Sequence, residues 1–260
     1  MRRFNVMAVA VIAGTITGAV LLVARSGNAR VRELRMRVLR DTLGVPSGPL
    51  GWISSRVMPL VAGPVYQLMA RELELVPEDD LLEVACGSGP FLARHASHVR
   101  YVAGLDLSET QVALGRRRLA DRIAVGTAEI VRGDAVALPW EDGRFSAVVC
   151  NSIVGFKEPE RALSEMCRVL RPGGRAVVVM NARVPEGTPS RWNDFGGWEW
   201  NEPDARRLLE DAGFADVAVF YDDVMGWKGG MSMRGVKRPS TVQVDAPSSV
   251  GASLVGSGVG

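Results

Sequence analysis

Three carboxylates and a glycine-rich turn carry the chemistry that this sequence suggests. The segment "LLEVACGSGPFL", residues 81–92, places Glu83 in an apolar run that ends in a turn containing Gly87 and Gly89. A strand that ends in such a turn and leads into a helix presents free backbone N–H groups and the positive end of the helix dipole. Asp106 ends the next apolar run, "VAGLDLS", and Asp134 follows the third, "VRGDAVALPW". The pattern predicts a binding site for a ligand with an anionic group.

The spacing of these residues indicates a nucleoside. Asp106 lies about 20 residues beyond the glycines, where an acidic side chain accepts hydrogen bonds from ribose hydroxyls. A dinucleotide-binding turn would have a third glycine that permits close packing of the helix, and Leu92 occupies that position. The alternative of a nicotinamide-dependent oxidoreductase is therefore disfavoured.

Short apolar runs alternate with helical patterns from residue 81 onward, which is typical of a parallel sheet with crossover helices. We expect strands at 81–85, 101–105, 128–132, 145–150, 175–180, 216–221 and 231–237, and helices within 89–99, 108–123, 158–170 and 202–214. The predicted fold is an α/β, Rossmann-like, mostly parallel seven-stranded sheet with helices on both faces. All three carboxylates then fall at or near the carboxyl ends of strands, the edge where open α/β sheets bind ligands.

At this point the sequence resembles a family. "LLEVACGSGPFL", "VAGLDLSETQVALGRRR", "VRGDAVALPWEDGRFSAVVCNSIVGF" and "EPERALSEMCRVLRPGGRAVVV" occur in order and at the usual spacing of class I S-adenosylmethionine-dependent methyltransferases. The likeness covers residues 81–180, with a weaker continuation to 238. Within the family it is most similar to the branch of quinone-biosynthesis C-methyltransferases and related small-molecule and lipid enzymes.

The resemblance implies a set of residues that bind S-adenosylmethionine. Glu83 would hold the amino group of the methionine part, the Gly87 and Gly89 turn would line that part, Asp106 would take the ribose hydroxyls and Asp134 the adenine amine. The same set includes Ala85, Leu107, Ala135 and Asn151. Ala85 departs from the family, which has glycine there, and alanine lacks glycine's conformational freedom.

No catalytic residue follows from the sequence. Relatives often keep a histidine or an acidic residue in the loop after the fourth strand, where this chain has Phe156 and Lys157. Asp194, Tyr66 and Tyr221 are weak candidates for a general base. His95 and His98 are the only histidines and have no further ligand nearby, so no metal site is predicted.

The cysteines and the charge distribution bear on disulfides, zinc sites and nucleic acid substrates. Cys86, Cys150 and Cys167 are far apart, form no C-x-x-C pair, and signal neither a disulfide framework nor zinc. Cys150 is not preceded by the proline of cytosine methyltransferases, so it is interpreted as a core residue. Eight arginines and two acidic residues up to position 45 give +6, which leaves −4 for the rest of a chain of net charge +2. That balance disfavours a nucleic acid substrate.

The N-terminal residues predict a membrane anchor. Residues 5–24 carry no charge, and about 20 such residues suffice to cross a bilayer. Two arginines precede this span and six follow it between residues 25 and 40, so the positive-inside rule places the downstream domain in the cytoplasm. The alternative is a cleaved signal peptide. Gly14 and Gly18 form a G-x-x-x-G pair that would allow the spans of a homodimer to pack closely.

The expected organisation is a transmembrane anchor (1–25), a basic collar and N-terminal cap or linker (26–77), a methyltransferase domain (78–238) and a flexible Gly/Ser-rich tail (239–260). The linker is too apolar for solvated coil, so we expect it to pack on the core.

The expected function is methyl transfer by in-line displacement to a small hydrophobic or lipid-like acceptor, such as a quinone or a lipid precursor. Trp192, Phe195, Trp198 and Trp200 follow the fifth strand and suit such an acceptor, although a packing lid or an interfacial anchor is the alternative. The alternative function, prompted by Ala85 and the missing histidine, is a cofactor-binding but non-catalytic assembly or regulatory protein.

Overall fold

The computed structural model describes residues 48–151, 153–181, 184, 187–192, 197–222 and 230–239. The predicted membrane span at 5–24, the arginine-rich collar up to residue 47 and the tail after residue 239 lie outside these ranges. Of the helices within the ranges, none combines the length and the apolar character needed to cross a bilayer.

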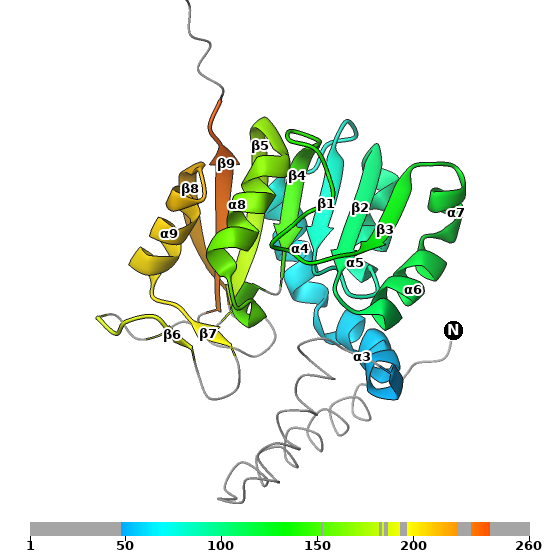
Figure 1. Cartoon of the computed structure of the whole chain (residues 1–260), viewed down its shortest axis with the longest axis horizontal. Coiled ribbons are helices and arrows are strands. Elements are labelled where there is room, and N and C mark those ends of the chain that lie inside the picture. Colours follow the sequence, from blue (N-terminus) through cyan, green and yellow to red (C-terminus); the bar gives the residue numbers. More distant parts are fainter. Residues whose placement is uncertain are drawn as a thin grey trace, which may run out of the picture.

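A seven-stranded sheet forms the centre of the molecule, in the order β3-β2-β1-β4-β5-β9-β8 (Figure 1). The strands are β1 (Asp80–Val84), β2 (Tyr101–Asp106), β3 (Ala128–Arg132), β4 (Phe145–Cys150), β5 (Leu170–Asn181), β8 (Phe214–Asp222) and β9 (Gly230–Lys237). β1 to β5 run parallel to one another, and β9 runs antiparallel to both β5 and β8. The predicted Rossmann-like, mostly parallel seven-stranded sheet is confirmed.

Helices cover both faces of the sheet, and each face has its own apolar core. One core joins α8 (Pro159–Val169) and α9 (Glu202–Asp211) to the sheet, with fully buried Phe145, Leu163 and Phe214. The other joins α5 (Pro90–His95) and α6 (Glu109–Arg118), with fully buried Phe91 and Leu92. Two expected helices are interrupted: a 3-10 turn, η2 (Ala96–His98), follows α5, and α7 (Ala120–Ala124) follows α6 after a break at Leu119.

The segment before β1 forms two helices, α3 (Gly48–Val61) and α4 (Gly63–Leu73). Val65, Met69 and Leu73 of α4 are completely buried in the second core, because their four-residue spacing gives the helix one apolar face. The Arg175 side chain donates hydrogen bonds to the carbonyl oxygens of Leu73 and, at 2.9 Å, Glu74, which tie the end of α4 to β5.

An ion cluster lies at the amino ends of the strands. It consists of Asp79, Asp80, Arg100, Arg144, Ser146 and Arg175. Arg175 Nη2 lies 2.6 Å from Oδ2 of the completely buried Asp79, and Ser146 Oγ donates to Oδ1 at 2.6 Å. Burial alone would raise the pKa of Asp79, but the hydrogen bonds from Arg175 and Ser146 outweigh it, so the pKa is lowered. The cluster joins the starts of β1, β2, β4 and β5 on the edge opposite the predicted ligand site.

Candidate functional site at the carboxyl edge of the sheet

The turn that follows β1 has an unusual backbone. Ala85, Gly87 and Gly89 all adopt positive φ angles, of 57°, 54° and 67°. The Cys86 amide donates to the carbonyl oxygen of Leu105 at 3.0 Å, and the Gly89 amide to that of Cys86 at 2.9 Å. These two amides are thus bonded within the protein, and the left-handed residues bend the backbone into a tight turn at the end of β1. Ala85 adopts the left-handed conformation despite its Cβ, at a cost of about 1 to 2 kcal/mol.

Asp106 holds this turn from the end of β2. Its Oδ2 accepts from the Gly87 amide at 2.8 Å and its Oδ1 from the Ser108 amide at 2.8 Å. Burial raises the pKa of Asp106, although these two hydrogen bonds act in the opposite direction. Each carboxylate oxygen has two lone pairs, so both can accept one further donor, such as a hydroxyl. The structure thus brings Asp106, the residue predicted to bind the ribose hydroxyls, together with the predicted glycine turn.

Glu83 lies beneath the turn with one oxygen unused. The side chain is 3% exposed, and its Oε2 has no hydrogen-bond partner among the described residues. Burial, followed by the charge of Asp106, raises the pKa of Glu83 well above its usual range, while the Leu92 amide lowers it in part. A buried carboxylate without a partner is costly. An ammonium group bound above it would remove that cost, so this residue fits the amino group of S-adenosylmethionine.

Two residues interact with Glu83 that the sequence does not indicate as cofactor-binding residues. Arg118 of α6 donates to the carbonyl oxygen and hydroxyl of Ser88, at 2.5 and 2.7 Å, and its charge acts on Glu83 and Tyr66. Arg118 is one of three consecutive arginines, and only the packing of α6 singles it out. Burial, then the charge of Glu83, raises the pKa of Tyr66, so its phenol stays a donor at neutral pH.

The predicted adenine end is more open. Leu107, next to Asp106, is 49% exposed and offers an apolar surface at the carboxyl edge. Asp134 is exposed, and its Oδ1 accepts from the Val136 amide at 3.2 Å, which fixes the turn that also contains the half-buried Ala135. The structure therefore places Leu107, Asp134 and Ala135 on the loops that follow β2 and β3.

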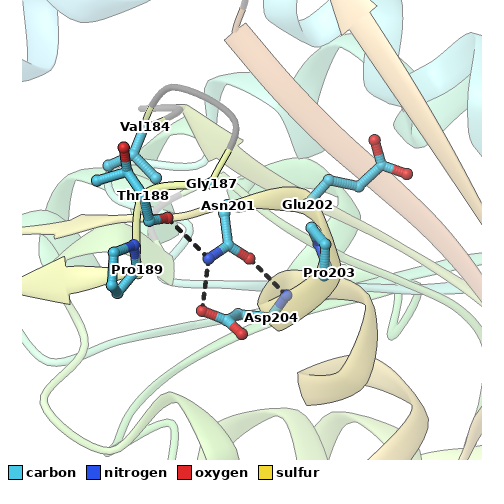
Figure 2. Close-up of a pocket in the computed structure, with 8 residues that line it drawn as sticks. All are labelled: Val184, Gly187, Thr188, Pro189, Asn201, Glu202, Pro203 and Asp204. Atoms are coloured by element: carbon cyan, nitrogen blue, oxygen red, sulfur yellow. Dashed lines mark hydrogen bonds between the residues drawn. The ribbon is translucent and has the colours of Figure 1, made fainter.

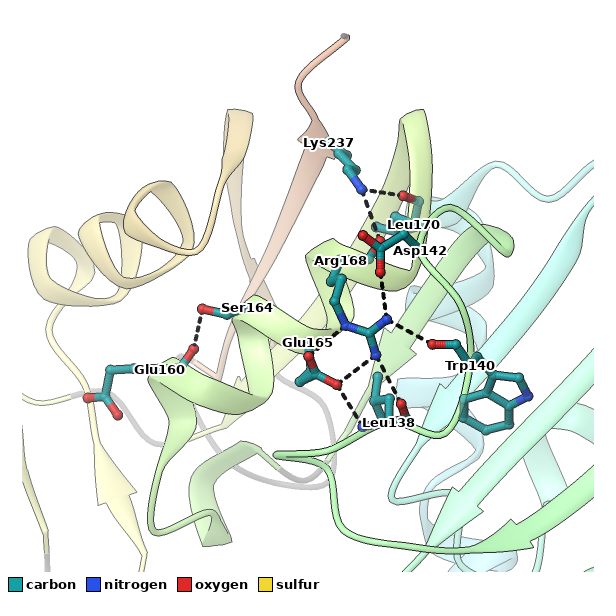
Figure 3. Close-up of polar contacts among 9 residues, drawn as sticks. All are labelled: Leu138, Trp140, Asp142, Glu160, Ser164, Glu165, Arg168, Leu170 and Lys237. Atoms are coloured by element: carbon teal, nitrogen blue, oxygen red, sulfur yellow. Dashed lines mark hydrogen bonds and ion pairs between the residues drawn. The ribbon is translucent and has the colours of Figure 1, made fainter.

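Arg168 of α8 holds the connection that follows Asp134 (Figure 3). Its guanidinium donates to the carbonyl oxygens of Leu138 at 2.9 Å and Trp140 at 2.8 Å, and pairs with Glu165 and Asp142. Glu165 in turn accepts from the Leu138 amide at 2.7 Å. The connection from β3 to β4 is thereby fastened to a helix, which restricts where its first turn can lie.

The loop after β4 supplies a second unpartnered polar atom. Asn151 follows the completely buried Cys150, and its Oδ1 is buried without a hydrogen-bond partner in the part of the chain that the structure describes. Cys150 belongs to the apolar core, as expected. Residues 153–157 of the loop contain neither a histidine nor a carboxylate.

An aromatic hairpin lies against the loop after β4. It consists of β6 (Arg191–Trp192), β7 (Trp198–Glu199) and the adjoining Trp200. Trp198 Nε1 donates to the Phe156 carbonyl oxygen at 3.1 Å, and the Trp198 ring stacks on Trp200 with centroids 4.8 Å apart. Trp192 meets Trp198 edge-on and is 43% exposed. The candidates Asp194 and Phe195 lie outside the described residues.

A cavity of about 620 Å³ lies at the start of α9 and contains none of the predicted site residues (Figure 2). Its polar side chains bind one another: Asn201 accepts from the Asp204 amide at 2.7 Å and donates to the Asp204 carboxylate and the Thr188 carbonyl oxygen. These contacts form the cap of α9, so the lining is explained by the helix itself. Tyr221, a weak candidate for a base, hydrogen-bonds to Glu202 beside this cavity.

The histidines lie apart from the site. His95 and His98, at the end of α5 and in η2, have ring centroids 6.1 Å apart, and His95 also contacts Phe91. Within the ranges that the structure describes, no group of three or more His, Cys, Asp or Glu residues is placed to hold a metal ion.

Residues 82–178 match the family described as a methyltransferase domain. The chain is 38% identical over 111 residues to a demethylmenaquinone methyltransferase of Clavibacter sepedonicus, covering 42% of this chain and 43% of that protein. It is 43% identical over 99 residues to a ubiquinone/menaquinone biosynthesis C-methyltransferase UbiE of Methylobacterium nodulans, covering 36% and 39%. The chain thus spans less than half the length of either relative.

Solved structures share the fold. The [4+2]-cyclase SpnF superposes with a TM-score of 0.59 at 23% identity, covering 68% of this chain and 82% of SpnF. Geranyl diphosphate C-methyltransferase of Streptomyces coelicolor, solved with Mg²⁺, geranyl diphosphate and S-adenosyl-L-homocysteine, gives 0.59 at 17% identity, covering 76% and 87%. At these identities the likeness concerns the fold alone.

Proposed function

We propose that this chain, which contains a class I S-adenosylmethionine-dependent methyltransferase domain, methylates a small hydrophobic or lipid-like acceptor, of the quinone or lipid-precursor type, at a membrane. One observation carries the proposal: Glu83 and Asp106 lie at or next to the ends of the paired parallel strands β1 and β2, beside the tight turn of left-handed residues that Asp106 holds through the Gly87 amide. The residues that the family uses for the cofactor thus converge at the edge where this fold binds ligands.

The described residues supply most of the cofactor's contacts in this proposal. Glu83 pairs with the ammonium group through its unpartnered Oε2, and Asp106 accepts from the ribose hydroxyls. Leu107 covers one face of the adenine ring. Tyr66 and Arg118 are a neutral donor and a cation that interact electrostatically with Glu83, and in this proposal they bind the carboxylate of the methionine part.

When bound, S-adenosylmethionine supplies an electrophilic methyl group on a sulfonium centre. The protein's task is then to hold the acceptor in line with that methyl group and to exclude water, an effect worth up to about 7 to 11 kcal/mol. In this proposal Asn151 orients a donor group of the acceptor, because its buried Oδ1 has no partner among the residues that the structure describes. Neither a metal ion nor a covalent intermediate is needed for this displacement.

The acceptor is proposed to lie between Asn151 and the aromatic hairpin. The hairpin is fastened to the loop after β4 by the bond from Trp198 to Phe156, so its rings border the space beyond that strand. Aromatic walls with few polar groups suit a flat, apolar ligand. The names of the two curated relatives, which refer to menaquinone and ubiquinone, support a quinone-type ring.

The N-terminal segment is proposed to place this domain at the cytoplasmic face of a membrane as a single-pass protein. The support is the uncharged stretch 5–24 and the six arginines between residues 25 and 40. An acceptor with a long apolar tail partitions into the bilayer, so anchoring raises the local concentration of enzyme where the acceptor is found. The Gly14 and Gly18 pair supports association of two such spans.

The test is to incubate the purified full chain with S-adenosylmethionine labelled on its methyl group and with a membrane lipid extract. We expect label in a hydrophobic, extractable product, and the Asp106→Ala variant should abolish it. Label confined to water-soluble products would contradict the proposed acceptor. Cofactor binding in a calorimeter without turnover on any extract would instead indicate the non-catalytic assembly or regulatory protein.

A further inference from the structure

The helix α3 exposes two large apolar side chains that do not pack into the core. In this helix of fourteen residues, Trp52 is 46% exposed and Ile53 is 42% exposed. The guanidinium of the exposed Arg56 lies 3.9 Å from the centroid of the Trp52 ring. Arg56 is one turn beyond Trp52, so all three side chains lie on one outward face, which we name the α3 face.

The opposite side of α3 fixes how this face is presented. Gly51 and Ser55 are buried, and Gln111 Nε2 of α6 donates to the Gly51 carbonyl oxygen at 2.8 Å. α6 begins three residues after Asp106, so α3 lies on the helix that leaves the cofactor edge. Figure 1 shows α3 next to α6, at the end of the molecule where the strands β1 and β2 terminate. The α3 face is therefore held outward close to the carboxyl edge of the sheet.

Charge and sequence indicate what this face meets. α3 contains no acidic residue, and its single charged residue is Arg56. The residues before it include six arginines between 25 and 40 against the single acidic residue Glu33, and only residues 25–47 separate α3 from the uncharged stretch 5–24. A tryptophan flanked by an aliphatic side chain and arginine is the composition that settles at the boundary between headgroups and acyl chains.

We infer that the α3 face rests on an anionic lipid bilayer and turns the carboxyl edge of the sheet toward it. The inference rests on the proposed membrane placement and adds an orientation to it. The contact can be weak in itself, since a chain already held at the surface meets it at high effective concentration. An acceptor embedded in the bilayer would then reach the carboxyl edge of the sheet without crossing water.

The experiment uses the full chain with a single environment-sensitive nitrobenzoxadiazole label, attached through Ile53→Cys or, separately, Arg56→Cys. The three native cysteines are buried and do not compete for the reagent. Val125→Cys is the matched control, because Val125 is 71% exposed at the end of α7, before the start of β3 on the opposite edge. Each protein is reconstituted with vesicles of phosphatidylcholine, with and without phosphatidylglycerol.

We expect emission at positions 53 and 56 to shift to shorter wavelength and to be quenched by spin-labelled lipids when phosphatidylglycerol is present. Position 125 should keep the emission seen in buffer. Vesicle flotation tests the membrane placement itself: a chain that does not float with vesicles refutes both that placement and this inference. A chain that floats while positions 53 and 56 emit like position 125 overturns the α3 orientation alone.

Discussion

The backbone nitrogen of Gly87 lies 2.8 Å from the Oδ2 atom of Asp106, so the end of β2 holds the turn that follows β1. One carboxylate therefore fixes the geometry of the turn and faces the proposed ribose position. Cofactor binding and the local structure of the turn are therefore coupled at this residue.

Asp106→Asn should weaken cofactor binding at least about tenfold. An amide has one acceptor oxygen in place of two, so the Gly87 or the Ser108 amide loses its partner, and hydrogen bonds to charged groups contribute about 1.5 to 3 kcal/mol. Titration calorimetry with S-adenosylmethionine measures the change. The exposed neighbour Glu109→Gln is the control and should bind as the parent does. Equal affinity in Asp106→Asn would remove this residue from the site.

Glu83→Gln should make the ligand-free protein more stable at neutral pH and weaken its affinity for the cofactor. The folded-state pKa of Glu83 is raised above its ordinary value of 4.5. Its favourable contribution to stability is therefore fully present below about pH 4.5 and is lost as pH rises through the folded-state pKa. The melting temperature of the variant should exceed that of the parent by a margin that grows from pH 4.5 upward. A margin that stays constant with pH would show that Glu83 does not carry this shift.

Ala85→Gly should raise the free energy of unfolding by about 0.5 to 1 kcal/mol. Relief of the left-handed strain, about 1 to 2 kcal/mol, exceeds the added entropy of glycine in the unfolded chain, about 0.4 to 1 kcal/mol. Urea denaturation measures the difference. Ala93→Gly, within α5, is the matched control and should lower stability by about 1 kcal/mol. Similar losses in both variants would contradict strain at Ala85.

Arg168→Met should lower the free energy of unfolding by about 2 to 3 kcal/mol, because two carbonyl oxygens and the Glu165 carboxylate lose a charged donor. The affinity for the cofactor should fall as well, since the connection that begins with Asp134 loses its attachment to α8. Chemical denaturation and calorimetry give the two values. Arg207→Met, which removes an exposed pair with Asp204 on α9, should leave both unchanged.

Trp198→Ala should raise KM for the methyl acceptor several-fold and leave the Kd for S-adenosylmethionine unchanged. The substitution removes the ring that stacks on Trp200 and the bond to Phe156 that fastens the hairpin. Trp198→Phe keeps an aromatic ring without the Nε1 donor, so its KM for the acceptor should lie between those of the parent and Trp198→Ala. If Trp198→Ala changes cofactor affinity and not KM, the hairpin does not border the acceptor.

The sequence predicts the parallel part of this fold well, because each strand is a short apolar run followed by a turn and a helix. The predicted strands 128–132 and 145–150 match β3 and β4 at both ends, and 81–85 differs from β1 by one residue. β5 is longer than the predicted 175–180: α8 ends at Val169 and the strand begins at Leu170, so "RPGG" lies within the strand. The antiparallel direction of β9 depends on tertiary pairing, which periodicity does not encode.

The site is predictable where one motif fixes both the residue and its place, as for Gly87, Gly89 and Asp106. Tyr66 and Arg118 could not be predicted in this role, because each approaches Glu83 through the packing of a separate helix. The unused acceptors of Glu83 and Asn151 are likewise visible only once neighbouring partners have been assigned.

The ion cluster around Asp79 and Arg175 lies on the edge opposite the glycine turn, and this separation has a consequence for how the protein can diverge. Substitutions that reshape the aromatic hairpin or the loop after Asn151 do not touch the contacts that join the starts of the strands. A library of variants confined to that hairpin and loop should therefore yield folded proteins with altered acceptor preference at high frequency. The same fold could acquire new acceptors in evolution without first gaining extra stability.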